Sequence, residues 1–559
     1  MSENMKLDRR TFLQYVGTGA AALAAASAGL GTLDGKANAA TAADHMFGYK
    51  TNKVSGYFEP IQHNTADKLI LPKGFKYDII AAYGDVINKK GDTFGYNNDF
   101  TVFFPINGSN TRGLLWVNHE YTSELWVTGG KTNGKFSPEQ IKKLLYNQGG
   151  SVIEVYQDEA GVWKMDTNSR YARRVTGLTP FALTGPAAGA PSVRGATTVQ
   201  GTFANCSGGM TLWNTLLSCE ENFEYTANDA GLEQTHYGWV IEVDPFDSKW
   251  QVRKHTALGR FNHENTAMGL TNDGRVVVYM GDDKKDAGVY KFISNGKYDP
   301  LLGRGNSKLL EDGKLYVANM KSGKWIELSI EAALAKINAS NFKMPSNAGL
   351  SVEEFKELVK TQGDVVTYAH AVAMLLGGTP TDRPEDVEIS PFDNTLFICH
   401  TNNDSHGNIH GHITRFFEKN GDLGSMEFDF EIFAAGGRQS GFSAPDNITF
   451  DSSGALWTVT DMSSGSMNKG VFTEFGNNGL YVIPSTGPAK GQALQFASAP
   501  KDAEMTGPWF TPDERTLFLA VQHPGENTED AANPTSMWPH RPGDNQPRPA
   551  VVAISGFKF

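Results

Sequence analysis

The stretch FSAPDNITFDSSGALWTVTD, Phe442 to Asp461, decides how the rest of the chain is interpreted. Asp446 opens a run of alternating apolar residues, Ser453-Gly454 has the composition of a tight turn, and a second apolar run ends on Asp461. Read as a β-hairpin, the stretch has one carboxylate at the start of its first strand and another at the end of its second. The two negative charges then lie at the same end of the hairpin, which calls for a physical reason.

The same pattern occurs six times along the chain. The copies are Gly95–Tyr121, Asn205–Asn222, His263–Asp283, Asp382–Asn403, Phe442–Asp461 and Thr506–Glu526. Hairpins that recur about every 60 residues predict a β-propeller. The predicted fold class is therefore all-β, a six-bladed β-propeller with inserted loops and a few short surface helices. A β-sandwich with ordinary turns is the alternative, but it would not place a ligand-type group at both open ends of every hairpin.

The longest intervals between hairpins, about 122–200 and 296–370, are interpreted as insertions. One of them contains SVEEFKELVKTQ, Ser351 to Gln362. Ser351 has the character of an N-cap, Glu354 follows three residues later, and apolar residues recur at helical spacing. We expect a surface helix here.

The N-terminus is interpreted as a targeting segment, not as part of the fold. Arg9 and Arg10 precede a modest Ala-rich apolar run, which is typical of a twin-arginine export signal. Ala37-Asn38-Ala39 fits the small-x-small cleavage pattern. We therefore expect a signal peptide at 1–39, a single propeller domain at 40–559, recognition by the twin-arginine export machinery, and a periplasmic or secreted protein without a stable membrane anchor. A membrane anchor is the alternative interpretation of the apolar run.

Charge and cysteine content narrow the class of protein. The formal net charge is -12 over 559 residues, which argues against nucleic acid as a partner. Cys206, Cys219 and Cys399 are the three cysteines, and they show no C-x-x-C zinc spacing. A Cys206–Cys219 disulfide remains possible on sequence alone. We expect a monomer.

In a propeller, the polar groups at one end of every hairpin would meet as a ring at one mouth of the central channel. The predicted ring contains Asn97, Asn98, Asp99, His119, Glu120, Cys206, Glu220, Glu221, His263, Glu264, Asp282, Asp283, Asp382, Arg383, Glu385, Asn402, Asn403, Asp446, Asp461, His523 and Glu526. So many carboxylates would repel one another unless cations compensate them. Oxygen ligands select hard cations such as Ca²⁺, and a thiolate with a few histidines would add a transition metal. The sequence therefore predicts a multinuclear metal site.

Other polar residues are assigned structural roles. Asp393, Asp451 and Asp513 are interpreted as turn residues, and GPAAG, Gly185 to Gly189, as a structural turn. The histidines of NDSHGNIHGH, His406, His410 and His412, resemble a metal-binding tract. Their irregular spacing favours solvated side chains instead.

The motifs together resemble the PhoX-type alkaline phosphatase family over almost the whole mature chain. The matching pieces are FGYNNDF, LLWVNHEY, YARRVTGLTPFALTGPAAG, SCEENF, GDD, TPTDRPED, SAPDN, TGPWFTPDERTLF and QHPGE. The resemblance implies a periplasmic or secreted phosphomonoesterase with a six-bladed propeller. It also implies a cofactor of about two Fe³⁺ and three Ca²⁺ ions bridged by an oxo group.

The resemblance also implies roles for individual residues. Glu120, Glu221 and Glu385 match calcium or bridging ligands, Glu264 matches an iron ligand, and Asp446 and Glu526 complete the ligand set. Arg383 matches a residue that binds the substrate phosphate with its planar fork. Further candidates are Asn98, Asp99, His119, Cys219, Glu220, Asp282, Asp283, Asp461 and His523.

The cysteine ligand to iron is left open between two residues. The hairpin register favours Cys206, which occupies the position of Asp446, Glu385 and Glu264 in other copies. Cys219 lies inside a strand and, by the period of two, shares a face with Glu221. Two departures from the family pattern stand out: T-L-W-N at Thr211–Asn214, which we expect beside the iron site, and Asn447 in place of glycine after Asp446.

The function predicted from these observations is alkaline phosphatase activity on small-molecule phosphate monoesters. A calcium-dependent propeller lactonase or phosphodiesterase is an alternative, since either would need only some of the carboxylates. A non-catalytic calcium-binding propeller is a third, and Arg383 and the cysteine argue against it. Fold alone does not decide among them.

Overall fold

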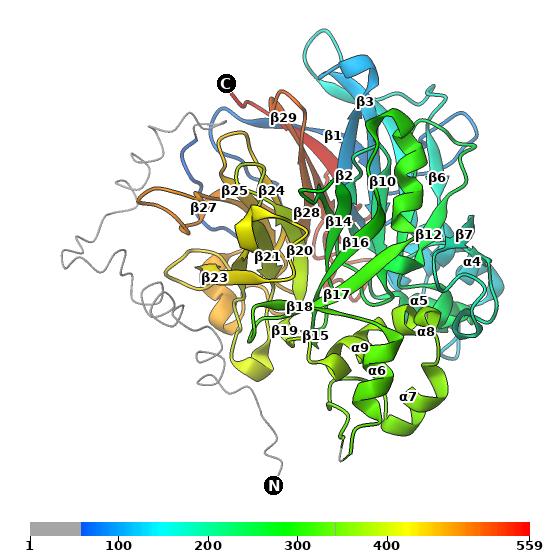
Figure 1. Cartoon of the computed structure of the whole chain (residues 1–559). Helices are drawn as coiled ribbons and strands as arrows, with labels where there is room; N and C mark the ends of the chain where they lie inside the picture. The colour runs from blue at the N-terminus through cyan, green and yellow to red at the C-terminus, as the bar shows by residue number, and fades with distance from the viewer. Residues whose placement is uncertain (1–57, 341, 559) are drawn as a thin grey trace.

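The chain is described by a computed structural model that covers residues 58–340 and 342–558 (Figure 1). The predicted export signal, residues 1–39, lies outside the described residues. Within the described part the protein is mostly β, with strands β1 to β30 in six sheets of four to six strands and one sheet of two. Among the same residues, no helix has the length and apolar character needed to cross a membrane.

Each of the six predicted hairpins is present as an antiparallel pair, and each belongs to a different one of the six larger sheets. The pairs are β2 (Asn98–Pro105) with β3 (Arg112–His119), β9 (Asn205–Met210) with β10 (Leu216–Glu220), β13 (Ala267–Leu270) with β14 (Arg275–Gly281), β20 (Pro384–Ile389) with β21 (Leu396–His400), β24 (Pro445–Phe450) with β25 (Leu456–Thr460), and β28 (Glu504–Phe510) with β29 (Thr516–Gln522). We call β2, β9, β13, β20, β24 and β28 the first strands.

The remaining strands extend these hairpins outward. They are β4 (Gly149–Gln157), β5 (Trp163–Met165) and β6 (Arg173–Val175) after β3; β11 (Val240–Val243), β12 (Arg253–His255), β7 (Pro180–Thr184) and β8 (Thr198–Gln200) after β10; β16 (Val289–Lys297), β17 (Gly313–Asn319) and β18 (Lys324–Glu327) after β14; β22 (His412–Glu418) and β23 (Phe428–Ala435) after β21; β26 (Gly479–Ile483) and β27 (Leu494–Ser498) after β25; and β30 (Ala550–Ser555) and β1 (Lys76–Ala82) after β29. The sheet of two pairs β15 (Lys285–Ala287) with β19 (Thr381–Asp382).

The first strands contact one another in cyclic order. β2 contacts β9, β9 contacts β13, β13 contacts β20, β20 contacts β24, β24 contacts β28, and β28 contacts β2. The last sheet contains both β1, from the beginning of the described chain, and β30, from its end. Antiparallel pairing of these two strands ties the ends of the described chain into one sheet.

The hydrophobic core lies between neighbouring sheets. Trp457, Phe496 and Leu519 are buried in one such cluster, and Phe103 and Phe518 stack with ring centroids 5.3 Å apart in another. Aromatic and β-branched residues suit this position, because they pack well on a pleated surface. The packing of sheet on sheet fixes where each hairpin end lies, and therefore where the polar groups at those ends meet.

The α-helices belong to connections between strands. They are α4 (Pro138–Tyr146), α5 (Phe223–Ala230), α6 (Ile330–Ile337), α7 (Val352–Leu358), α8 (Gln362–Thr367) and α9 (Ala369–Leu376). We call residues 330–376, which contain α6 to α9, the helical insertion; it lies at the lower right of Figure 1.

The helix predicted at Ser351–Gln362 is confirmed at its start by the Ser351–Glu354 capping box, but it ends at Leu358. The expectation of surface helices is wrong for α8 and α9, whose apolar residues are almost all buried in the core.

Candidate active site

β-bulges at the beginning of the first strands aim polar side chains toward a common point. In five hairpins two residues of the first strand face one residue of the second: Asp99–Phe100, Cys206–Ser207, Glu385–Asp386, Asp446–Asn447 and Gly507–Pro508. Bulges redirect side chains and are common beside functional sites. The register makes Cys206 the counterpart of Asp99, Glu385 and Asp446, as the hairpin alignment predicts.

A left-handed residue precedes four of these bulges by two positions. Its φ is 38° at Asn97, 53° at Ala204, 58° at Arg383 and 55° at Ala444. A non-glycine residue in this region costs on the order of 1–3 kcal/mol and persists only where the surroundings enforce it. The chain therefore turns sharply before each of these strands. Of the four residues, Arg383 alone is a cation, and the turn directs it among the carboxylates.

The groups at the hairpin ends line one cavity of about 250 Å³, which we call the acidic pocket. Its lining residues are Asp99, Glu120, Tyr121, Cys206, Glu221, Asn222, Asp283, Arg383, Glu385, Asp446, Asp461, Ser463, Ser464, Glu504, Gln522, His523 and Glu526. Nine of these are carboxylates, whereas Arg383 and His523 are the cationic or potentially cationic members. The excess of carboxylates over cations gives a physical reason for the two acidic residues at one end of a hairpin. Carboxylates in excess can bind metal cations.

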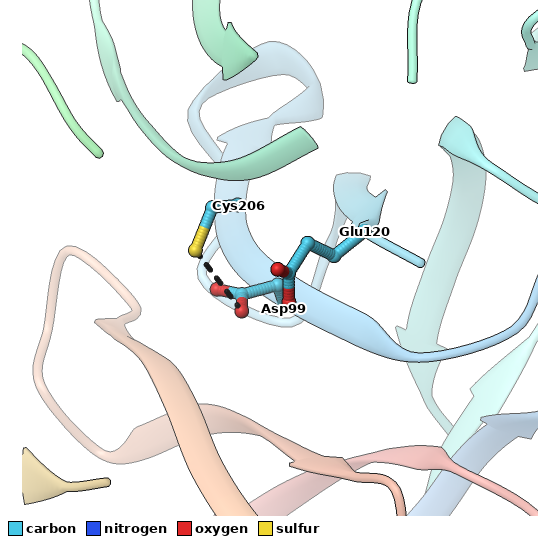
Figure 2. Close-up of side chains that lie close together, drawn as sticks. All are labelled: Asp99, Glu120 and Cys206. Carbon is cyan, nitrogen blue, oxygen red and sulfur yellow. Dashed lines mark hydrogen bonds between the residues drawn. The ribbon is translucent and has the colours of Figure 1, made fainter. Parts of the chain in front are cut away.

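Cys206 lies at the centre of the polar cluster. Its Sγ is 3.2 Å from Glu264 Oε1 and 3.7 Å from Asp99 Oδ2, and Figure 2 shows the thiol directed at Asp99 with Glu120 beside it. The three groups of side chains that could each hold one ion are Asp99–Glu120–Cys206, Cys206–Glu221–Glu264 and Glu264–Glu385–Asp446. All ligand atoms within a group are within 4.8 Å of one another. The groups overlap at Cys206 and Glu264, so they form one continuous cluster.

Arg383 spans the carboxylates on one side of the acidic pocket. Its Nη2 is 2.7 Å from both Asp283 Oδ2 and Glu385 Oε1, while Nη1 is 3.8 Å from Asp461 Oδ2. Thr401 also donates to Glu385 Oε1 at 2.8 Å. The guanidinium is therefore fixed on one edge, and Nη1 makes only the longer contact.

Burial makes the charged form of these acids unfavourable. Burial, with repulsion from nearby carboxylates, raises the pKa of Glu120 to about 7 and that of Glu385 to about 8. The same causes raise the pKa well above its usual range at Asp99, Glu221, Glu264, Asp446 and Glu504. Glu526 differs: its pKa is lowered despite burial, because His523, Ser464 and Tyr121 stabilise the carboxylate.

The donor set fits metal ions. Asp99 Oδ1, Glu264 Oε2 and Asp283 Oδ1 are buried oxygens without a hydrogen-bond partner. Such atoms are costly unless a ligand satisfies them. Carboxylate oxygens suit hard cations, and the Cys206 sulfur suits a softer transition metal. Residues that could hold metal are therefore present.

Several predicted ring members lie away from the acidic pocket. His119 contacts Ser151 at 2.8 Å, Glu220 forms a buried ion pair with Lys254 at 2.5 Å, and Asp282 contacts His370 at 2.8 Å. Cys219 is packed among apolar side chains, and all three cysteines are free thiols, so the possible Cys206–Cys219 disulfide is absent. The predicted ring was too wide because residues next to each other on a strand point to opposite faces.

Other ring members are buried near the site without lining it. Asn98 donates weakly to the Val521 carbonyl at 3.5 Å. His263 donates from Nε2 to the Gly259 carbonyl at 2.8 Å and stacks on Phe261. Glu264 does not line the cavity either, but it belongs to two of the three possible metal groups. Asp99, Asp283, Asp461 and His523 do line it.

Glu504 is the main residue that the hairpin pattern missed. It lies at the start of β28, lines the acidic pocket, and its Oε2 is 3.2 Å from His523 Nε2. The sixth hairpin has Gly507 at the bulge position, where a Cβ would meet Thr101 N at 2.5 Å. The repeated position therefore carries no ligand in this hairpin. Gln522, Tyr121, Asn222, Ser463 and Ser464 were also missed.

The two departures from the family pattern lie in different surroundings, and the expectation that the first lies beside the iron site is wrong. Thr211–Asn214 forms the turn between β9 and β10, at the end opposite Cys206, and Asn214 takes the left-handed conformation that glycine would favour. Asn447 is not left-handed; its amide donates to Asp446 Oδ1 at 3.1 Å and to Glu264 Oε1 at 3.4 Å. This asparagine therefore supports two carboxylates that could hold a metal ion.

The histidine tract is also more ordered than expected. His406 Nδ1 contacts Asp382 Oδ1 at 2.6 Å and its Nε2 contacts Asp286 Oδ1 at 3.0 Å. His412 is buried and stacks on His400. These contacts anchor Asp382, the residue before Arg383. The assigned turn residues behave as expected: Asp451, for example, accepts from the backbone N–H groups of Ser453 and Ala455.

The chain is similar to known proteins over most of its length. The chain matches the family model described as alkaline phosphatase PhoX over residues 56–525. Among solved structures, Pseudomonas fluorescens PhoX in complex with vanadate, a transition state analogue, is 31% identical. That match covers 89% of this chain and 97% of the other, with a TM-score of 0.77.

Weaker matches carry no argument. A gluconolactonase from Xanthomonas campestris is 12% identical, covering 83% of this chain and 97% of the other, with a TM-score of 0.29. The PQQ domain of pyranose dehydrogenase from Coprinopsis cinerea is 8% identical, covering 89% and 99%, with a TM-score of 0.24. No match was found among curated proteins. The family model and the PhoX structure together show that the chain belongs to the PhoX alkaline phosphatase family and hydrolyses phosphate monoesters.

Proposed function

We propose that the acidic pocket is the active site of this phosphatase, with calcium and iron ions held by its carboxylates and Cys206 and the substrate phosphate bound by Arg383. The observation that carries the proposal is the overlap of three possible metal groups at Cys206 and Glu264, beside Arg383. Family membership favours phosphomonoester hydrolysis over the lactonase, phosphodiesterase and non-catalytic alternatives.

The ligand types suggest which ions the groups hold. Cys206 belongs to two groups, and its sulfur favours iron there. Glu264, Glu385 and Asp446 offer oxygen alone, which favours calcium. We propose about three calcium and two ferric ions with a bridging oxo group, Glu526 completing the set. Such cations would supply Lewis-acid charge that neutralises phosphoryl oxygens.

Arg383 is the protein group proposed to recognise the phosphate. Asp283 and Glu385 hold its Nη2 at 2.7 Å and so fix the plane of the guanidinium. A planar fork can donate two parallel hydrogen bonds to two phosphoryl oxygens, which a lysine cannot. Contacts that strengthen as negative charge spreads over those oxygens stabilise the transition state more than the bound substrate.

We further infer that the six sheets are the blades of a six-bladed propeller. The cyclic contacts of the first strands and the sheet shared by β1 and β30 support this arrangement. The opposite ends of the first strands line a different cavity, of about 500 Å³, with Phe450, Trp509 and Phe510 in its wall. The difference between the two cavities fits a central channel with one acidic mouth and one apolar mouth. Export as a folded monomer to the periplasm or beyond remains our proposal from the twin-arginine signal.

Elemental analysis of the purified protein tests the metal proposal. We expect iron and calcium together, with phosphatase activity on an aryl phosphate that rises with the content of both. If the active protein contains calcium but no iron, the proposed iron site is wrong and the thiol of Cys206 has no metal to bind. A fully active protein containing neither metal would overturn the proposal.

A further inference from the structure

The cavity at the far ends of the first strands is separate from the acidic pocket. We call it the distal cavity; its volume is about 500 Å³. On β20, Glu385 lines the acidic pocket and Glu388 lines the distal cavity; on β28 the corresponding residues are Glu504 and Trp509. At about 3.3 Å per residue, the two cavities are about 10–17 Å apart along these strands. The proposed phosphatase chemistry assigns no role to the distal cavity.

The wall of the distal cavity is mainly apolar. The half-buried rings of Phe450, Trp509 and Phe510 supply aromatic surface, and Met210 and Ile389 add further apolar surface. These five residues come from four of the first strands, so the packing of the sheets holds them in place before any ligand binds. Small-molecule sites are typically cavities of about 300–1,000 Å³ that are lined by apolar side chains and a few polar groups. The distal cavity has both properties.

The charged side chains of the distal cavity are acidic. Glu388 and Glu514 line it, and no lysine, arginine or histidine of the described residues does so. The two oxygens of Glu514 already accept hydrogen bonds from the backbone N–H and the hydroxyl of Ser452, at 2.7 and 2.6 Å. Glu388 has no ion pair in the described part of the chain, and the backbone N–H of Ile389 is the group that stabilises its charged form. Glu388 is therefore the carboxylate with capacity for a cation.

The Glu388 side chain lies on the side of β20 that faces Phe450. Asp386 Oδ2 accepts from the backbone N–H of Ile448 at 2.7 Å, so the Asp386 side chain points toward β24. Residues two apart on a strand share a face, and β20 and β24 both run from the acidic pocket to the distal cavity. Glu388 follows Asp386 by two residues, as Phe450 follows Ile448. The carboxylate and the ring therefore meet in the wall of the distal cavity, which both line.

The charge of Glu388 lacks compensation within the chain. Burial raises the pKa of Glu388 to about 8. Burial and then repulsion from Glu388 raise the pKa of Asp386 well above its usual range. A cation in the distal cavity would stabilise both carboxylates. Ca²⁺ takes about six to eight oxygen ligands, which the aromatic wall does not offer, whereas aromatic faces attract cations that carry alkyl groups.

We propose that the distal cavity binds an organic cation, a quaternary or other alkylated ammonium group, with its charge against Glu388 and its alkyl groups against the aromatic wall. A quaternary ammonium has no N–H to donate, so its attraction to Glu388 is one between opposite charges. The rings of Phe450, Trp509 and Phe510 contribute cation–π attraction and apolar contact. This site is independent of metal binding and of phosphate binding at Arg383.

Binding to the metal-loaded protein tests the proposal. Choline is the probe, and 3,3-dimethylbutan-1-ol is its neutral analogue, in which a carbon atom replaces the charged nitrogen. In titrations followed by the NMR signals of the ligand, the parent protein should bind choline at least about tenfold more tightly than the alcohol. Glu388→Gln keeps the shape of the side chain and removes its charge. It should abolish the preference for choline and leave the affinity for the alcohol unchanged.

Glu514→Gln is the matched control, because Glu514 lines the same cavity but its oxygens are engaged by Ser452. It should leave the preference for choline unchanged. Phe450→Leu keeps Glu388 and removes one ring, so choline affinity should fall about threefold. Hydrolysis of an aryl phosphate should not change in any of these variants, which shows that they are folded. Equal losses of choline binding in Glu388→Gln and Glu514→Gln would indicate general attraction to negative charge and would overturn the proposal.

The acidic pocket is a second place where an organic cation could bind. If choline competes with an aryl phosphate and Glu388→Gln does not change that inhibition, the cation binds in the acidic pocket and the proposal is wrong. A parent protein that binds choline no more tightly than the alcohol, or that binds neither, also contradicts it. None of these outcomes affects the phosphatase proposal, which depends on metal content and turnover.

Discussion

Buried carboxylates occur in two kinds of surroundings in this protein. Away from the acidic pocket, Glu220 pairs with Lys254 at 2.5 Å within one sheet, and Glu418 pairs with Lys291 at 2.9 Å between two sheets. Glu418 also accepts hydrogen bonds from Tyr279 OH at 2.6 Å and Trp325 Nε1 at 3.1 Å. In the acidic pocket, nine carboxylates share Arg383 and His523.

The difference separates structural acids from ligands. A buried carboxylate that has its own cation and donors within the chain is complete, so its loss should affect folding. Carboxylates that lack such partners are complete only when external cations bind, so their loss should affect metal content and activity. The two regions therefore predict opposite phenotypes for the same kind of substitution.

Removing the metals should have the largest effect. Exhaustive chelation should lower activity on an aryl phosphate by at least about 10³-fold, since bound cations supply several kcal/mol of transition-state stabilisation. It should also lower the melting temperature, because the carboxylates are left to repel one another. Activity and calorimetry before and after calcium and iron are restored provide the measurement. Full activity after chelation and dialysis would show that the carboxylates of the acidic pocket have a structural role and do not bind catalytic metal ions.

Among changes away from the acidic pocket, Lys291→Met should lower the stability of the fold the most. It leaves Glu418 buried without its cation, so the free energy of unfolding should fall by about 3–5 kcal/mol, measured by urea denaturation. Lys291→Met/Glu418→Gln should recover much of this loss, because glutamine is neutral and still accepts a hydrogen bond. Specific activity and metal content of the folded fraction should not change. Loss of metal in the single variant would break the distinction between the two regions.

Arg383→Lys should reduce kcat/KM by about 10²–10³-fold although the charge is kept, because lysine cannot present two parallel donors to a phosphate. Steady-state kinetics on an aryl phosphate, with metal content measured in the same sample, provides the test. Arg415→Lys is the control: Arg415, on β22, pairs with Asp393 and Glu431 and does not line the acidic pocket. Near-normal kinetics in a fully metallated Arg383→Lys enzyme would make Arg383 a structural counter-ion like Lys291.

Cys206→Ser should reduce iron content and lower activity by about 10- to 100-fold, because a hydroxyl is a poor replacement for a soft thiolate. Cys219→Ser and Cys399→Ser are matched controls, since both thiols are buried outside the possible metal groups. Absorption of an iron–thiolate bond and elemental analysis are the readouts. If Cys219→Ser loses iron and Cys206→Ser does not, the register argument fails.

The pH dependence of the Lys291 pair should be the smallest effect. Burial lowers the pKa of Lys291 from 10.5 to about 8. Between these values the unfolded chain binds the proton and the folded protein does not, so this group makes stability rise with pH. From pH 8 to pH 10 the parent should therefore gain about 1–2 kcal/mol relative to Lys291→Met/Glu418→Gln. A constant difference between the two unfolding curves across that range would exclude the lowered pKa.

The hairpins and most of the acidic pocket could be predicted from sequence, because the pattern repeats. Alternating apolar residues identify the strands, and a polar residue at the same register position in several copies identifies the ligands, as for Cys206 and Asp446. The pattern did not identify Glu504, because Gly507 occupies the repeated position in the sixth hairpin. A Cβ added at Gly507 would lie 2.5 Å from Thr101 N, which belongs to a neighbouring sheet far away in sequence.

The sequence alone determined the repeated hairpins, the excess of carboxylates at one end of them and the family to which the chain is similar. The tertiary structure decided which of those groups meet. His119, Glu220 and Cys219 lie within one or two residues of a pocket-lining residue, yet they point into the sheets. A shift of one residue reverses the face of a strand, and β-bulges make such shifts where the ligands begin. Only the packing of neighbouring sheets determines where a bulge forms, so the direction of each side chain is a property of the whole fold.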